Sequence, residues 1–198
     1  MTAEQFAGLI LFAFVSSITP GPNNLMLLTS GVNYGLRRTV PHMLGIAGGF
    51  TFMLAVIGLG LSGLFTAVPA LQLVLKVLCL AYLLYLAWRM ARSGPIRAGE
   101  GNGRSRPMAW YEAVAFQWVN PKAWAMALTA FAAYAAGKAS AGALLVAGIF
   151  GLVNLPCILA WALFGVGLRG MLSDPKRVRV FNFVMAFLLV VSVLPFLR

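Results

Sequence analysis

Ionisable side chains are scarce in this sequence, and acids are the scarcest. Only 10% of the 198 residues are charged; 4 are acidic, 15 are Lys or Arg, and a single histidine is present. Soluble domains carry about 25% charged residues, so this chain has too few polar groups to cover a surface that faces water. The composition excludes a soluble globular protein.

The shortage of reactive groups argues against catalysis. Cys79 and Cys157 lie 78 positions apart within apolar stretches, which favours small core residues over a disulfide or a metal site. A phosphate-binding loop, a zinc-protease motif and a pair of acids in an apolar segment are all missing from the sequence. The G-L-S-G sequence at 60–63 resembles an intramembrane serine protease motif, but that chemistry needs a later histidine, and the sole histidine, His42, precedes it. We therefore expect no enzyme, no metal site and no cofactor.

Hydrophobic residues are abundant. They make up 61% of the chain, and the mean hydropathy is +0.90. A helix needs about 20 apolar residues to cross a bilayer, and apolar runs near that length occur at 4–30, 42–64, 68–91, 110–136, 142–168 and 178–197. The sequence predicts an all-α integral membrane protein with six transmembrane helices in contact with the lipid bilayer.

A single long polar segment divides the chain. Residues 92–109, rich in Gly, Pro, Ser and Arg, predict a linker between a three-helix repeat at 1–91 and a second at 110–198, within one membrane domain. Eleven of the 15 basic residues lie in or beside this linker and the two other loops on its side of the membrane. Because basic loops face the cytoplasm, the linker is expected to be cytoplasmic and both termini external. The basic residues form no stripe interleaved with aromatics, so we expect no nucleic acid as a partner.

Residues 19–24, Thr-Pro-Gly-Pro-Asn-Asn, interrupt the first apolar segment. Each proline removes a backbone donor and clashes with the preceding turn, so the helix is expected to break there. Backbone groups freed at membrane depth are tolerated only where they are buried in protein or line a wet cavity. The break therefore predicts an irregular segment that faces protein or a cavity.

The fourth apolar segment carries a second break, at residues 117–122 (QWVNPK). Asn120 lies ten residues after Trp110, about 15 Å along a helix and near the middle of the bilayer. Pro22 and Pro121 are 99 positions apart, half the chain length. Because each half crosses the membrane three times, the second half starts on the opposite side of the membrane and is inverted relative to the first. This pattern predicts two inverted three-helix repeats with broken helices 1 and 4. The alternative is that both prolines serve packing alone.

Lys122 is the one formal charge deep in an apolar segment, where a lysine costs about 2.5–3.5 kcal/mol. Glu112 is ten residues away, too far along one helix to pair with it. The remaining partners are freed carbonyls, the C-terminal end of a half-helix or a bound anion. The alternative is a lysine that snorkels or merely caps the half-helix.

Two weaker patterns accompany the breaks. Gly31/Gly35 and Gly45/Gly49 have the four-residue spacing of close helix contacts, and we interpret them as packing. In the fifth segment, Asn154 with a nearby proline forms a milder polar kink.

The motif TPGPN at Thr19–Asn23, the pattern Gly35-x9-Gly45-x3-Gly49 and the motif NPK at Asn120–Lys122 resemble the LysE/RhtB family of bacterial amino-acid exporters over essentially the whole chain. The doubled Asn23-Asn24 and the sequence FQWVN ending at Asn120 look most like the cysteine/O-acetylserine exporter branch. Many relatives have aspartate where this chain has Asn23, so neither break retains a titratable acid.

The resemblance implies a multi-pass secondary transporter of the bacterial inner membrane that works by alternating access, with proton coupling and a homodimer left open. It would export small neutral amino acids or derivatives, cysteine/O-acetylserine-like or homoserine/threonine-like. Lysine and arginine are not expected as substrates, because no buried acid is present to pair with their side-chain cation. The alternative function is a non-transporting membrane scaffold or regulatory subunit.

A zwitterionic substrate would place its carboxylate at Lys122 or at the half-helix starting near Asn23, and its ammonium at carbonyls near Thr19 or Asn120. The expected substrate-binding residues are Thr19, Pro20, Gly21, Pro22, Asn23, Asn24, Gln117, Asn120, Pro121, Lys122 and Asn154.

Overall fold

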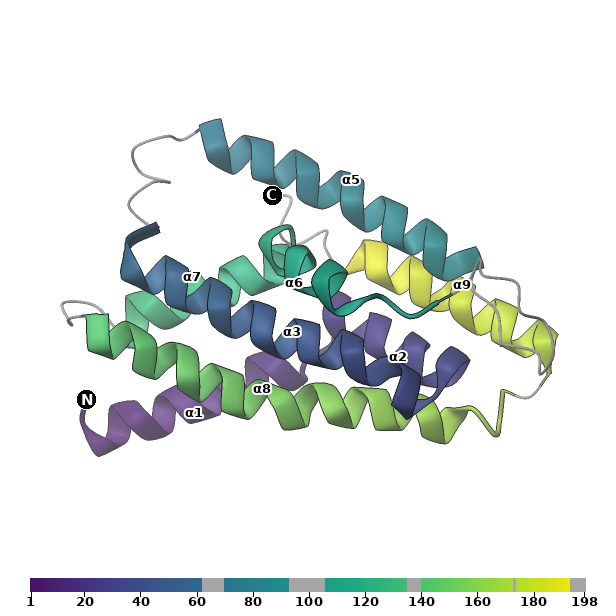
Figure 1. Cartoon of the computed structure of the whole chain (residues 1–198), viewed down its shortest axis with the longest axis horizontal. Helices are drawn as coiled ribbons and strands as arrows, with labels where there is room; N and C mark the ends of the chain where they lie inside the picture. The colour runs from purple at the N-terminus through teal and green to yellow at the C-terminus, as the bar shows by residue number, and fades with distance from the viewer. Residues whose placement is uncertain (62–69, 93–105, 135–139, 173, 193–198) are drawn as a thin grey trace.

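Every described element of the computed structural model is a helix. The structure describes residues 1–61, 70–92, 106–134, 140–172 and 174–192, so most of the predicted linker and the end of the sixth segment lie outside it. The elements, drawn in Figure 1, are α1 (Ala3–Ile18), α2 (Pro22–Tyr34), α3 (Leu36–Val56), the π-helical turn η1 (Ile57–Leu61), α5 (Ala70–Arg92), α6 (Trp110–Trp118), α7 (Pro121–Tyr134), α8 (Ser140–Leu168) and α9 (Pro175–Val191).

Each predicted apolar segment overlaps one of these helices or a helix pair. Within the described ranges, Leu36–Gly60 and Ala141–Leu168 are each long and apolar enough to cross a membrane. The pair α1 and α2 qualifies as a third span, bent by 52° at its break. Two or three spans thus follow from length and composition, and the count of six stays a prediction.

The predicted start of the second segment, at residue 42, was wrong. The helix α3 begins at Leu36, because Gly35, with φ of 77°, turns the chain directly after α2. Its first turn carries the exposed Arg37 and Arg38. A search for apolar runs finds only the part of a helix that suits hydrocarbon, so it missed this charged turn.

The two halves of the chain pack across one another. Both α1 and α2 contact α8, α3 contacts α6, and α5 contacts α9. In terms of the predicted segments, the first therefore meets the fifth, the second meets the fourth, and the third meets the sixth. Figure 1 shows α5 along one side of the bundle and α1 with α8 along the opposite side.

Glycines allow two of these contacts to bring backbones together. A Cβ atom on Gly31 of α2 would collide with the carbonyl of Ala162 in α8, and one on Gly45 of α3 with the carbonyl of Trp110 in α6. The packing interpretation is confirmed for these two glycines. It is also confirmed for Gly49, where a Cβ atom would lie 2.7 Å from Val114 Cα. Gly35 ends α2 with a positive φ, and a Cβ atom there would lie 3.0 Å from Arg169 Nη1.

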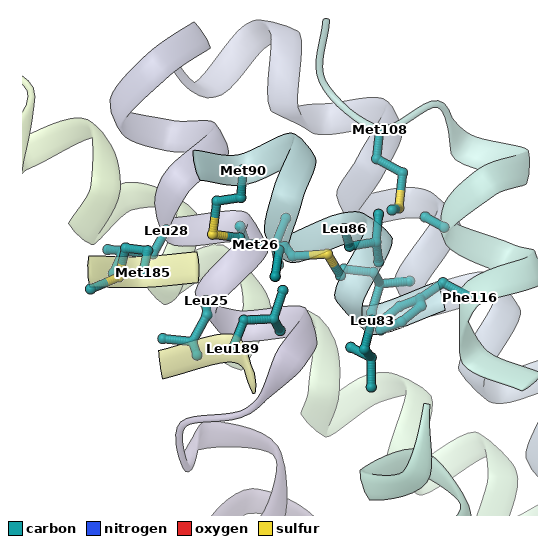
Figure 2. Packing of buried hydrophobic residues seen from close by; sticks show 14 of the residues in the cluster. Leu25, Met26, Leu28, Leu83, Leu86, Met90, Met108, Phe116, Met185 and Leu189 are labelled. Atoms are coloured by element: carbon teal, nitrogen blue, oxygen red, sulfur yellow. The ribbon is translucent and has the colours of Figure 1, made fainter. Parts of the chain in front are cut away.

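The apolar core consists of two clusters, and each break joins one cluster to the other. In the first cluster, α2 and α6 contribute Leu25 and Phe116; in the second, α1 and α7 contribute Leu9 and Ala127. The irregular segments between α1 and α2 and between α6 and α7 thus lie between the two clusters, whereas α3 and α8 run through both. Figure 2 shows the first cluster, with labelled side chains Leu25, Met26, Leu28, Leu83, Leu86, Met90, Met108, Phe116, Met185 and Leu189.

Candidate functional site

The first break lies between α1 and α2. Thr19 leaves the helical conformation with ψ of 145°, Gly21 is extended, and Pro22 is the first residue of α2. Proline suits that position because its missing N–H would have no helical partner. The predicted break is confirmed, and the last carbonyls of α1 need donors from elsewhere.

Side chains of α2 and α8 supply several of these donors. Asn24 Nδ2 donates to the carbonyl oxygens of Ser17 and Thr19, each at 2.8 Å. Trp161 Nε1, from the C-terminal third of α8, donates to the carbonyl oxygen of Ile18 at 2.9 Å. The end of α1 is thus held by specific hydrogen bonds.

Lys122, the second residue of α7, completes the set. Its ammonium donates to the Thr19 carbonyl at 2.7 Å, to the Thr19 hydroxyl at 3.0 Å and to the Pro20 carbonyl at 3.4 Å. The stem of the lysine crosses Gly21, where a Cβ atom would lie 2.6 Å from Lys122 Cδ. Of the partners that the sequence left open, freed carbonyls at the end of a half-helix are therefore the ones that Lys122 contacts here.

The second break, like the first, has a proline at the first position of the following helix. The helix α6 ends at Trp118, and α7 begins at Pro121. Asn120 precedes this proline, and its Oδ1 accepts a hydrogen bond from the backbone N–H of Lys122 at 3.1 Å, as an N-cap residue does. Trp124 Nε1 donates to the carbonyl of Trp118 at 2.8 Å. The predicted break in the fourth segment is confirmed.

The two breaks meet. Asn23 Nδ2 donates to Gln117 Oε1 at 2.9 Å, and Gln117 Nε2 donates to Asn23 Oδ1 at 3.3 Å. Gln117 is fully buried and also donates to the carbonyl of Ala113 at 2.8 Å. Together with the contact of Lys122 with Thr19, this amide pair joins the irregular segments of the two halves.

A cavity of about 30 Å³ lies at this junction. Ser17 Oγ and Asn154 Nδ2 are buried at it and have no hydrogen-bond partner in the described part of the chain. A buried donor left unpaired costs about 1–3 kcal/mol, so these atoms suggest an absent ligand or water. The volume suits a water molecule or two. The lining residues are Ser16, Ser17, Gly21, Asn23, Asn24, Phe50, Asn120, Lys122, Ala123, Met126 and Asn154.

The predicted site residues fall into three groups. Gln117, Thr19 and Pro20 do not line the cavity but hydrogen-bond to Asn23 or Lys122, which do. Pro22 and Pro121 begin the two half-helices. Those that line the cavity are Gly21, Asn23, Asn24, Asn120, Lys122 and Asn154. Their role in substrate binding stays a prediction.

Two residues at the junction of the breaks, Ser17 and Trp161, were not among those predicted from the sequence. The serine pair directly before the first break was a signal for Ser17, since hydroxyls beside irregular backbone face its polar groups. The indole N–H of Trp161 lies within a long apolar helix, where it needs an acceptor. The acceptor, Ile18, is 143 positions away, so only the packing of α1 on α8 reveals it.

An all-helical chain with apolar spans, two broken helices and a polar cavity where they meet belongs to the class of membrane transport proteins. No group of three or more His, Cys, Asp or Glu residues that could hold a metal occurs in the described ranges. The family model of the LysE type translocator matches residues 14–198. The chain therefore belongs to this family and is a transporter rather than an enzyme, as the motifs predicted.

Named relatives cover most of the chain. It is 28% identical over 196 residues to the cysteine/O-acetylserine efflux protein of Escherichia coli (strain K12), covering 96% of each chain. The protein of the same name in Salmonella typhimurium is 28% identical over 171 residues, 83% of this chain and 84% of its own length. That of Klebsiella pneumoniae is 29% identical over 134 residues, 68% of this chain and 67% of its own. No solved structure matches the chain.

Proposed function

We propose that this translocator exports small neutral amino acids of the cysteine and O-acetylserine type from the cytoplasm through the bacterial inner membrane. The names of its relatives support the substrate class. The observation that carries the proposal is the cavity between the two breaks, where four asparagines, two serines and Lys122 converge and two buried polar atoms lack partners.

The polar groups at the cavity suit both ends of a zwitterion. The carbonyls of Thr19 and Pro20 with the Thr19 hydroxyl form a cation site, which the Lys122 ammonium fills here. The unpaired donor of Asn154 is available to a carboxylate. We infer that the substrate ammonium replaces that of Lys122 on these oxygens, and that Lys122 then turns to the substrate carboxylate.

The charge of the lining favours neutral side chains on the substrate. None of the residues that line the cavity within the described ranges is Asp or Glu. Lysine or arginine would bring a second cation without a counter-charge into a poorly solvated site. Cysteine and O-acetylserine carry no such charge.

The crosswise packing supports two inverted three-helix repeats. Exchanging the two halves turns the contact of the first segment with the fifth into that of the fourth with the second, and turns the contacts of the third with the sixth and of the second with the fifth into themselves. The smaller contact of α2 with α9 is an exception. An inverted repeat requires such a self-consistent set. In this proposal all six segments span the membrane, and residues 92–109 form a cytoplasmic linker.

The small cavity implies that transport needs movement. An amino acid does not fit about 30 Å³, so in this proposal the cavity widens during an alternating-access cycle. Each break joins one apolar cluster to the other. Hinge movements at the two breaks, of α1 relative to α2 and of α7 relative to α6, would open the cavity to one side at a time.

A non-transporting scaffold or regulatory subunit remains the second candidate. The observation in its favour is that side chains already satisfy the carbonyls of Ser17, Ile18, Thr19 and Pro20, as purely structural breaks would require. The unpaired atoms of Ser17 and Asn154 speak against it.

Exchange across proteoliposomes separates the two candidates. With purified protein, we expect saturable exchange of labelled O-acetylserine or cysteine at least about tenfold above protein-free liposomes, and little exchange of labelled lysine. Lys122→Met should reduce the exchange about tenfold or more, whereas Lys122→Arg should retain part of it, because a planar guanidinium replaces a compact ammonium poorly. A folded wild-type protein without exchange would contradict export and favour the scaffold.

A further inference from the structure

A groove of about 540 Å³ lies where α8 ends and α9 begins. Leu168 of α8, Met171 and Leu172 of the turn that follows, and residues from the first turns of α9 line it. None of the residues that line this groove lines the cavity between the breaks. Its volume lies in the range of about 300–1,000 Å³ that is typical of sites for small molecules.

The part of the groove that α9 contributes is cationic at one end and apolar beyond it. Lys176 and Arg177 line it from the first turn of the helix, and Val180 and Phe181 line it from the next turn. Because residues four positions apart share a face of a helix, each cation stands in line with an apolar side chain. Val180 is 64% exposed. This order of groups matches a ligand with an anionic head and an apolar tail.

The positive charge of the groove is not compensated by the chain itself. Lys176 and Arg177 are exposed, and neither side chain has an ion-pair partner in the part of the chain that the structure describes. Residues 168–181 include four basic residues and one acid, Asp174. The carboxylate of Asp174 caps α9, where it accepts a hydrogen bond from the backbone N–H of Lys176 at 2.9 Å. The groove is therefore suited to an anion.

The groove lies at a basic end of the bundle. Figure 1 shows the end of α8 and the beginning of α9 at the same end of the bundle as the end of α5, whose last turn carries Arg89 and Arg92. Basic loops face the cytoplasm, and the cytoplasmic leaflet has a negative surface potential because it contains anionic lipids. In the predicted topology the groove therefore opens at the level of anionic headgroups.

We propose that this groove binds an anionic phospholipid of the cytoplasmic leaflet. The lipid phosphate contacts the Lys176 ammonium and the Arg177 guanidinium, which bind phosphate as a point charge and as a fork of donors. An acyl chain then lies over Val180 and Phe181, along α9 toward the membrane interior. A free phosphate would use the two cations and leave the apolar wall without a role. The site does not depend on the proposed export function.

Native mass spectrometry of the purified protein tests the site without any transport. The detergent-solubilised protein is titrated with phosphatidylglycerol or with phosphatidylcholine of the same acyl chains. We expect one phosphatidylglycerol per chain to bind at least about tenfold more tightly than phosphatidylcholine, since each nearby cation contributes to the attraction. Equal retention of the two lipids by the wild type would overturn the proposal.

Two matched double variants separate this groove from the net charge of the protein. In Lys176→Gln with Arg177→Gln the preference for phosphatidylglycerol should fall at least about fivefold. Arg37→Gln with Arg38→Gln removes the same charge from two adjacent, exposed residues in the first turn of α3, which do not line the groove. This control should keep the preference of the wild type. An equal loss in both double variants would show that the lipid follows net charge alone and contradicts the proposal.

The apolar wall distinguishes a lipid from a free anion. Val180→Gln keeps both cations and changes an exposed side chain, so the fold should persist while the affinity for phosphatidylglycerol falls several-fold through lost apolar contact. Inorganic phosphate in excess should not displace the lipid. Displacement by phosphate, or unchanged affinity in Val180→Gln, overturns the lipid site, as would a dimer that occupies the groove and excludes the lipid. A wild type without exchange activity would contradict export and leave these lipid-binding expectations unchanged.

Discussion

Asn23 and Gln117, 94 positions apart, exchange two hydrogen bonds between their side-chain amides, at 2.9 and 3.3 Å. Asn23 belongs to the first turn of α2 and Gln117 to the last turn of α6, so the pair fixes the two breaks relative to each other. Two amides suit this task because each is both donor and acceptor, and neither brings a charge into the membrane interior.

Replacing either amide should leave at least one polar atom of its partner without this hydrogen bond. We expect Asn23→Ala and Gln117→Ala each to lower the free energy of unfolding by about 1–3 kcal/mol. The double variant should lose clearly less than the sum, with a coupling of about 0.5 kcal/mol or more. Chemical unfolding of the four proteins in detergent measures this cycle, and strictly additive losses would contradict the pairing.

Gly21 gives room to the stem of Lys122. Gly21→Ala would place a Cβ atom 2.6 Å from Lys122 Cδ, so the ammonium should leave the Thr19 carbonyl and exchange flux should fall about tenfold, with a small change in stability because the lysine is flexible. Gly48→Ala is the matched control, since its Cβ position is open. Equal flux in the two variants would show that the position of the lysine does not matter.

The break between α6 and α7 depends on Pro121. In Pro121→Ala the restored N–H lets the two helices join, which moves Lys122 away from the first break. We expect normal expression and a loss of exchange flux of about tenfold or more. Pro156→Ala serves as the control because α8 already runs through that proline without a break. A Pro121→Ala protein with full flux would reduce this break to a packing feature.

The charge distribution predicts which side of the membrane each loop faces. In a background without cysteine, a membrane-impermeant thiol reagent added to intact cells should label Ser140→Cys and leave Gly101→Cys unlabelled, because basic loops are retained in the cytoplasm. Labelling of both positions after the cells are opened is the control. The opposite pattern would invert the topology and the position of both termini.

Local chemistry made the breaks predictable. Proline, glycine and asparagine at residues 19–24 and 117–122 dictate where a helix stops and starts again, and the helix bounds confirm both places. The glycines at 31 and 45 likewise mark close contacts through their spacing, although the sequence did not identify which helix they would face.

Contacts between the halves were not predictable. From the sequence, three kinds of partner were possible for Lys122. Only the contact between the two breaks shows that its ammonium bonds to the carbonyls of Thr19 and Pro20. The bond from Trp161 to Ile18 depends on how α8 crosses α1. The surroundings of His42 were not predictable either, because Arg89 and Arg106, which line a cavity with it, come from distant segments.

The central claim is that the cavity between the breaks binds the substrate, and Asn154→Leu tests it most directly. Leucine has a similar volume and removes a buried donor that has no partner among the described residues, so the purified variant should be at least as stable to heat as the wild type. If Asn154 binds the substrate carboxylate, exchange of labelled O-acetylserine by the same preparation should fall about tenfold or more. Thermal stability at or above that of the wild type with lost exchange is the predicted result. A stable Asn154→Leu protein with undiminished exchange would contradict the account.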